Sequence, residues 1–149
     1  MDIKRANRFD TIELSSLTIR SKSYWRYDPA QIKAWESELR LSEEYIENKG
    51  VYKLLGEHVV IGYYSYFELN RELVKLDNLF VDPPFIGQGY GKILLNDFLR
   101  RIQKLGYKGV HLDADPHAES FYIKHGFKII GHLESSIKNR FLPVMAMEL

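Results

Sequence analysis

Residues 73–105 read LVKLDNLFVDPPFIGQGYGKILLNDFLRRIQKL, and this stretch decides the fold. Apolar residues over Leu73–Val81 predict a strand, two prolines predict a turn, and a loop with three glycines leads into an amphipathic helix over Tyr90–Leu105. Glycine has no Cβ and adopts positive φ, so such a loop brings several backbone N–H groups close to an anion. The positive end of the helix dipole adds to that attraction. The stretch therefore predicts a phosphate or pyrophosphate site at the start of the helix.

Two other nucleotide-binding loops fit this stretch poorly. A P-loop is excluded because Gly91-Lys92 is followed by Ile93 rather than Ser or Thr, and Ile86 stands where its first glycine belongs. The dinucleotide pattern G-x-G-x-x-G has a different last gap, although Asp113 lies near the place of its acidic residue. A dinucleotide site and a glycine-rich turn with only a packing role remain open as alternatives.

Two segments together resemble the GNAT acetyltransferase family. Residues 86–91, IGQGYG, resemble its acyl-coenzyme-A loop, Arg/Gln-x-x-Gly-x-Gly/Ala, except that Ile86 replaces the Arg or Gln. Residues 115–127, DPHAESFYIKHGF, resemble its second signature, Asn-x-x-Ala-x-x-x-Tyr-x-x-x-Gly-Phe, with Asp115 in place of Asn. The similarity covers about residues 73–131 closely. Earlier residues match only in the order of their elements.

The pattern of residues predicts a mixed α/β sheet with helices on both faces. Strands Val51–Leu55 and Val59–Phe67 form a hairpin that leads to Leu73–Val81. Lys108–Asp113 must run parallel to Leu73–Val81 because a helix crosses between them. The other expected elements are a strand at Met1–Arg5, a helix capped by Asp10 that ends near Ser23, a helix over Pro29–Leu39, a short helix capped by Ser42, a helix between Asp115 and Gly126, and strands Phe127–Leu133 and Leu142–Leu149.

Composition narrows the function classes. The 149 residues suit one domain, 1–149, and the net charge of +1 with no basic run argues against a nucleic-acid partner. The absence of cysteine excludes disulfides and a cysteine acyl-enzyme. No apolar run approaches the roughly 18 residues of a membrane span, and the first residues lack the apolar segment of a secretory signal. We therefore expect a cytoplasmic protein that does not bind membranes.

The GNAT resemblance implies a fold and a reaction. The fold would be a mostly antiparallel sheet whose parallel strand pair splays apart to admit the pantetheine arm. The reaction would move the acetyl group of acetyl-CoA directly to a primary amine of a small molecule or peptide in a ternary complex, without a metal. The resemblance also implies a possible homodimer. A non-catalytic acyl-CoA-binding or regulatory module on the same fold is the alternative.

Site residues follow from the same resemblance. Tyr122 occupies the position of the catalytic tyrosine, the acid that protonates the leaving thiolate; its alternative is a core tyrosine. The expected cofactor contacts are Leu79, Phe80, Val81, Ile86, Gly87, Gln88, Gly89, Tyr90, Gly91, Lys92, Asp115, Ala118, Phe121 and Tyr122. Asp115 also suits a helix cap.

The base and the acceptor contacts are expected elsewhere. A neutral amine is needed for attack, so a base or a water chain must take its proton. We expect Asp77 as that base, with Asp113, near His111, as second candidate. Tyr24 and Trp25 are expected to wall the acceptor pocket, although Trp25 also suits a core position. Arg140 is expected to bind an acceptor carboxylate, or else to lie in a solvated turn.

Overall fold

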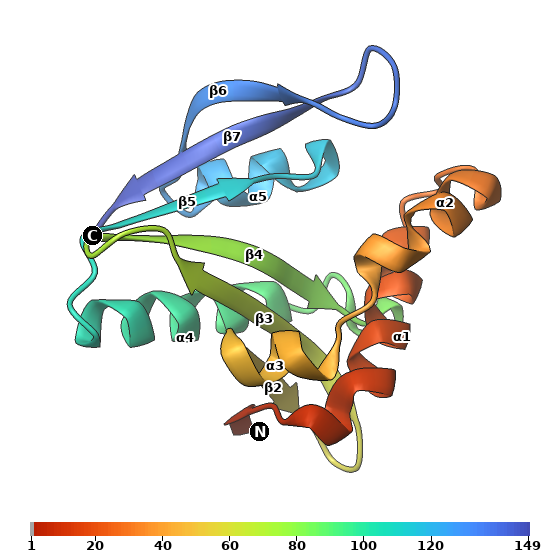
Figure 1. Cartoon of the computed structure of the whole chain (residues 1–149), viewed down its shortest axis with the longest axis horizontal. Coiled ribbons are helices and arrows are strands. Elements are labelled where there is room, and N and C mark those ends of the chain that lie inside the picture. Colours follow the sequence, from red (N-terminus) through yellow and green to blue (C-terminus); the bar gives the residue numbers. More distant parts are fainter. Residues whose placement is uncertain (1) are drawn as a thin grey trace. The chain divides into compact units, whose positions relative to one another are not determined.

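The structure is a computed structural model that describes residues 2–149 (Figure 1). The predicted order of elements is confirmed, and most boundaries agree to within one residue. The strands are β1 (Asp2–Arg5), β2 (Gly50–Leu55), β3 (Val60–Glu68), β4 (Leu73–Val81), β5 (Gly109–Asp113), β6 (Lys128–Glu134) and β7 (Phe141–Glu148). The α-helices are α1 (Thr11–Ser23), α2 (Pro29–Leu39), α3 (Glu43–Asn48), α4 (Tyr90–Lys104) and α5 (Glu119–Lys124), and 3₁₀ turns η1, η2 and η3 cover Arg8–Asp10, Pro83–Phe85 and Pro116–Ala118. Met1 of the predicted first strand lies outside the described residues.

The strands form a mixed sheet in the order β1-β2-β3-β4-β5-β7-β6. The predicted parallel pair is confirmed, with Leu73 opposite Gly109 and Lys75 opposite His111. The β1–β2, β2–β3, β5–β7 and β6–β7 pairs are antiparallel. By its contacts the chain divides into two compact units, Met1–Tyr66 with Asn78–Arg100, and Phe67–Asp77 with Arg101–Leu149. Within residues 2–149 no helix has the length and apolarity needed to cross a bilayer.

Strand β3 of the first unit is buried on both faces. Tyr63 packs in a core cluster with Leu14 and Leu17 of α1 and Ile46 of α3. Tyr64 points to the opposite face, because side chains alternate along a strand, and donates to Asp97 of α4 at 2.7 Å. The first unit therefore carries helices on both faces of its strands, as predicted.

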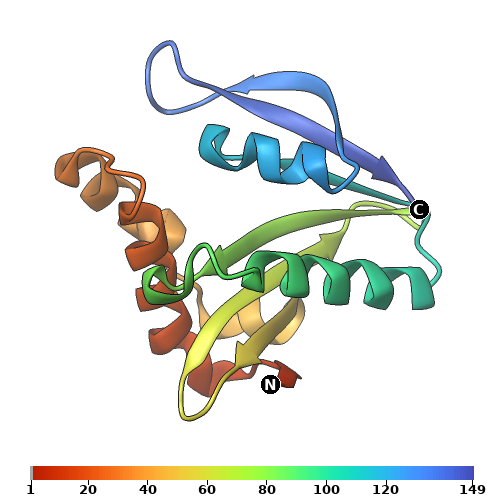
Figure 2. The ribbon, with the colours of Figure 1, turned by 180° about the vertical axis from the view of Figure 1, so that it is seen from behind.

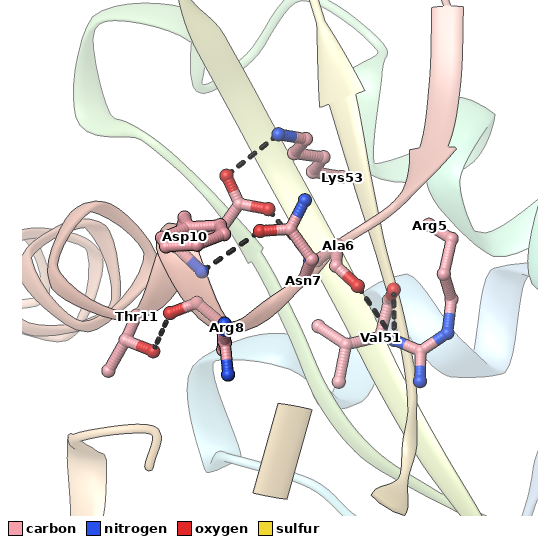
Figure 3. Close-up of polar contacts among 9 residues, drawn as sticks. Arg5, Ala6, Asn7, Arg8, Asp10, Thr11, Val51 and Lys53 are labelled. Carbon is pink, nitrogen blue, oxygen red and sulfur yellow. Dashed lines mark hydrogen bonds and ion pairs between the residues drawn. The ribbon is translucent and has the colours of Figure 1, made fainter. Parts of the chain in front are cut away.

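Helix α1 begins at Thr11, directly after Asp10, as predicted, but its capping differs from the prediction. Asp10 is not the side-chain cap; Asn7 caps η1 instead by accepting from the Phe9 N–H at 2.9 Å, while Asp10 accepts from the Asn7 N–H at 2.9 Å (Figure 3). The capping box thus lies one turn earlier, ahead of a 3₁₀ turn. Asp10 also pairs with Lys53 of β2 at 2.7 Å, which joins the helix start to the sheet.

The second unit joins the start of β4 to β5, β7 and β6, with η3 and α5 between β5 and β6 in the chain. Its buried side chains include Val110, Leu112, Met145 and Phe127. The single helix expected between Asp115 and Gly126 is instead η3 followed by the short α5.

A test of the first unit's packing concerns Gly62 on β3. A Cβ at Gly62 would lie 2.5 Å from the Phe80 carbonyl oxygen and 3.2 Å from the Val81 Cα, so the backbone of β4 would have to move. We expect Gly62→Ala to lower the free energy of unfolding in urea by about 1–3 kcal/mol.

Gly131→Ala on β6 is the matched control, because a Cβ there meets nothing within 4 Å. Its effect should stay within about 0.5 kcal/mol. Equal stability of the two variants would contradict the packing described for Gly62.

Candidate active site

The glycine-rich loop connects β4 to α4 in the first unit. The chain leaves β4 at Val81, passes through η2 and enters α4 at Tyr90. Gly87 and Gly89 have φ values of 84° and 86°, and a Cβ at either would meet nothing within 4 Å. Glycine is therefore required there for the left-handed backbone and not for space.

The loop presents unbonded amides to solvent. The first i→i−4 bond at the start of α4 runs from the Ile93 N–H to the Gly89 carbonyl at 3.3 Å, so the earlier amides have no carbonyl within the helix to bond. Gly87, Gln88 and Gly89 are exposed. Together with the positive end of the 15-residue α4, these amides form a surface suited to an anion.

Two contacts brace the loop against its own turn. The Gln88 side chain donates to the Pro84 carbonyl at 3.1 Å, so it is directed back toward η2. The Tyr90 ring meets Phe85 edge-on, with centroids 6.1 Å apart. Ile86, which stands in place of Arg or Gln, donates its N–H to the Pro83 carbonyl at 3.2 Å.

An ion pair that the sequence did not reveal holds the beginning of the loop. Asp82, only 7% exposed, directly precedes η2 and receives two hydrogen bonds of 3.0 Å from Nε and Nη2 of Arg20 on α1. The hydrogen bond with Asp82 raises the pKa of the Arg20 guanidinium above its ordinary value. No local pattern could have found the pair, because its members lie far apart in sequence.

The end of β4 supplies the other expected cofactor contacts of this unit. The Phe80 ring is half-buried and packs toward Tyr63 and the core cluster. Leu79 and Val81 are half-buried, and the alternation of the strand puts them on the face opposite Phe80. Lys92 is exposed on the first turn of α4, and Gly91 lies within that turn without a positive φ.

Tyr24 and Trp25 follow the last turn of α1 and are exposed by 47% and 38%. Their rings meet edge-on at 5.0 Å. The core position considered for Trp25 is therefore wrong; the buried tryptophan is Trp35 of α2, which contacts Tyr27 at 5.0 Å.

Tyr122 lies on α5 in the second unit. Its side chain is 7% exposed and packs edge-on against Phe121 at 5.2 Å and Phe127 at 5.4 Å. Burial raises the pKa of the Tyr122 phenol and keeps it protonated.

Asp115, in the second unit, caps η3, which is one of the two roles expected for it. It accepts from the His117 N–H at 2.9 Å and pairs with the His117 ring at 2.8 Å. It also pairs with Arg140 Nη2 at 3.2 Å, and the Arg140 side chain is 15% exposed. Arg140 is therefore held against Asp115 and is not directed into solvent. Ala118 closes η3, half-buried, and Phe121 is half-buried on α5.

The two candidate bases also lie in the second unit. Asp77 is exposed near the end of that unit's part of β4. Asp113 forms an ion pair with Lys75 at 2.8 Å, so its charge is balanced by a neighbouring cation. His111, in register with Lys75, is half-buried on β5.

The candidate residues are thus divided between the units. The glycine loop, Tyr24 and Trp25 belong to the first, and Tyr122, Asp77, Asp113, Asp115 and Arg140 belong to the second. In the part of the chain that the structure describes, no three His, Asp or Glu side chains gather closely enough to hold a metal ion.

Comparison with solved structures identifies the fold. PaiA N-acetyltransferase from Thermoplasma acidophilum, solved in complex with coenzyme A, superposes with a TM-score of 0.80 at 19% identity, covering 99% of this chain and 98% of that one. A GCN5-related N-acetyltransferase from Rhodopseudomonas palustris gives 0.82 at 18% identity, over 99% and 95% of the two chains. YncA from Salmonella typhimurium, solved with its cofactor acetyl-CoA, gives 0.71 at 19% identity, over 99% and 93%.

Comparison of the sequence with family models leads to the same family as the comparison of structures. No curated protein matches the sequence. The family model described as acetyltransferase (GNAT) domain matches residues 25–149, most of the chain, and includes both predicted signatures. The loop between β4 and α4 and the tyrosine of α5 therefore sit in a chain that belongs to the GNAT acetyltransferase family.

Proposed function

We propose that this protein transfers an acetyl group from acetyl-CoA to a primary amine, directly within a ternary complex. The observation that carries the proposal is the exposed loop with left-handed Gly87 and Gly89 at the start of α4. Membership of the GNAT family supports it, as do the relatives solved with coenzyme A or acetyl-CoA.

The cofactor would be held mainly by main-chain groups. The loop amides over residues 87–92 would bind the pyrophosphate, whose charge the helix end also favours. Main-chain groups of Leu79 and Val81 would pair with the amides of the pantetheine arm, as a neighbouring strand does. Ala118 and Phe121 are the proposed apolar contacts of the cofactor, and Asp115 would order η3 through its cap rather than touch the cofactor.

The reaction requires two proton movements. The neutral amine nitrogen forms a bond to the thioester carbon, the C–S bond then breaks, and its electron pair passes to sulfur. Tyr122 would donate its phenolic proton to that sulfur and give free coenzyme A as the thiol. The proton lost by the amine would pass to Asp77 directly or through water.

The choice of Asp77 over Asp113 rests on exposure. Asp113 is half-buried and is held by Lys75 at 2.8 Å. Asp77 is exposed to solvent and so can pass a proton to water. The exposed rings of Tyr24 and Trp25 would form the wall against which the acceptor lies.

The proposal is tested by measuring thiol release from acetyl-CoA with a panel of small amines, amino acids, aminoglycosides and peptides. We expect at least one amine to accelerate thiol release well above hydrolysis, with the product carrying the acetyl group on nitrogen. Binding of coenzyme A without consumption of acetyl-CoA with any of these amines would favour the non-catalytic module instead.

The loop itself is tested by Gly89→Ala. A Cβ at φ 86° strains the backbone by about 1–2 kcal/mol, so the loop should reorganise and the Kd for coenzyme A should rise roughly tenfold. Isothermal titration calorimetry measures this directly. Gly106→Ala is the matched control, because Gly106 has a φ of 93° and a Cβ there also meets nothing within 4 Å, but it lies after α4 and outside the loop; it should bind coenzyme A like the wild type. Equal affinities for the two variants would contradict the proposed role of the loop.

The acid is tested by Tyr122→Phe. We expect kcat to fall by about 10²–10⁴-fold, the usual contribution of a positioned proton donor, with little change in the Kd for coenzyme A. Because burial raises the phenol pKa, the wild type should not lose this acid as pH rises to about 10, where a free tyrosine is half ionised. A fall in kcat near pH 10 that disappears in Tyr122→Phe would contradict the assignment.

A further inference from the structure

The backbone and side chain of Asp82 are both fixed within the first unit. Its N–H donates to the Ile61 carbonyl of β3 at 2.8 Å, and its own carbonyl accepts from the Phe85 N–H at 2.9 Å. Its carboxylate takes both hydrogen bonds from Arg20. The position of Asp82 therefore sets where η2 begins, and η2 leads directly into the glycine loop.

The main chain of Arg20 bonds to the residue that directly follows α1. Its carbonyl accepts the Tyr24 N–H at 3.2 Å, and the Tyr24 ring contacts Trp25 at 5.0 Å. Directly after Trp25, Arg26 adopts a φ of 60°, which residues other than glycine rarely do and which is often found beside functional sites. Arg20 thus bonds with its side chain to Asp82, at the beginning of the cofactor loop, and with its main chain to Tyr24 of the candidate acceptor wall. In the ribbon of Figure 2, α1 (red to orange) lies beside the loop that leads from β4 into α4 (green).

We propose that Arg20 and Asp82 are positioning residues that couple the glycine loop to Tyr24 and Trp25, so that cofactor binding sets the acceptor wall. The inference rests on the proposed function. Neither residue touches the reacting atoms; they act through the loop and through the end of α1. By linkage, an acceptor that contacts the wall would tighten coenzyme A by the same factor by which the cofactor tightens the acceptor.

The geometry explains why the pair requires arginine. Its planar guanidinium donates through two nitrogens to the two carboxylate oxygens, which fixes an orientation as well as a distance. A lysine keeps the charge but attaches at one point, so it would hold Asp82 without fixing the direction of α1 relative to η2.

The test needs no knowledge of the acceptor. The chain has two tryptophans, Trp25 and Trp35. Protein labelled with 5-fluorotryptophan should give two fluorine NMR signals, assigned with Trp25→Phe. Coenzyme A alone is then titrated into the wild type, Arg20→Gln and Arg20→Lys, and its Kd is measured by calorimetry.

We expect coenzyme A to shift the Trp25 signal in the wild type. In Arg20→Gln the shift at saturation should be lost, while the Kd rises by roughly 2- to 30-fold, the range found for mutations that weaken coupling. Arg20→Lys should be intermediate, and it replaces Arg20→Gln if that variant does not fold or bind. Arg40→Gln is the matched control, because it breaks another arginine–carboxylate pair of the first unit, with Glu36 on α2, and should keep the wild-type shift.

Each other result would overturn the inference. An unchanged Trp25 shift in the Arg20 variants, or a wild type that binds coenzyme A without any Trp25 shift, would show that the pair serves stability alone. A wild type that does not bind coenzyme A would overturn the proposed function, and this inference with it.

Discussion

The left-handed backbone at Gly87 and Gly89 is the constraint on which the rest of the candidate site depends. It turns the chain into α4 while leaving several amides without carbonyl partners, and only a residue lacking Cβ accepts it at little cost. An anion held by main-chain dipoles is bound well only if those dipoles are already oriented, because reorienting them on binding would cancel much of the gain. The bonds from Gln88 to Pro84 and from Arg20 to Asp82 supply that fixed orientation.

Strand β3 positions both α1 and α4 through a hydrogen bond on each of its faces. The Tyr63 hydroxyl bonds to Thr18 of α1 at 2.6 Å, and the Tyr64 hydroxyl bonds to Asp97 of α4 at 2.7 Å from the opposite face. Both rings are fully buried, so an unpaired hydroxyl at either would be costly. The two hydrogen bonds therefore set the places of α1 and α4 more narrowly than apolar packing alone would.

The features that the sequence predicts correctly here are local. Hydrophobic periodicity, capping side chains and glycines act within a few residues of the chain. The boundaries of β4 and α4, the cap at Ser42 and the turn at the glycine loop could therefore be predicted from the sequence. The start of α1 was predicted correctly, but its capping box was placed one turn too late because Asp10 and Asn7 both suit a cap, and only the 3₁₀ turn distinguishes them.

Features that depend on contacts between distant parts of the chain could not be predicted from the sequence. The pairs of Arg20 with Asp82 and of Lys75 with Asp113 exist only once helix placement and strand register are set. The same holds for which of the two tryptophans, Trp25 or Trp35, is buried. The resemblance to the GNAT family, and not any local pattern, singled out Tyr122 among the ten tyrosines as the candidate acid.

The environment of Tyr122 bears on the order of events in the proposed reaction. A phenol whose pKa is raised by burial keeps its proton until negative charge develops beside it. Sulfur gains such charge as the C–S bond breaks, and the apolar rings of Phe121 and Phe127 would strengthen a hydrogen bond that the phenol donates to it. Protonation would therefore accompany bond cleavage rather than precede it. The rise of the rate with pH would then report the loss of a proton from the acceptor amine, whose free pKa is near 10, and not the state of Tyr122.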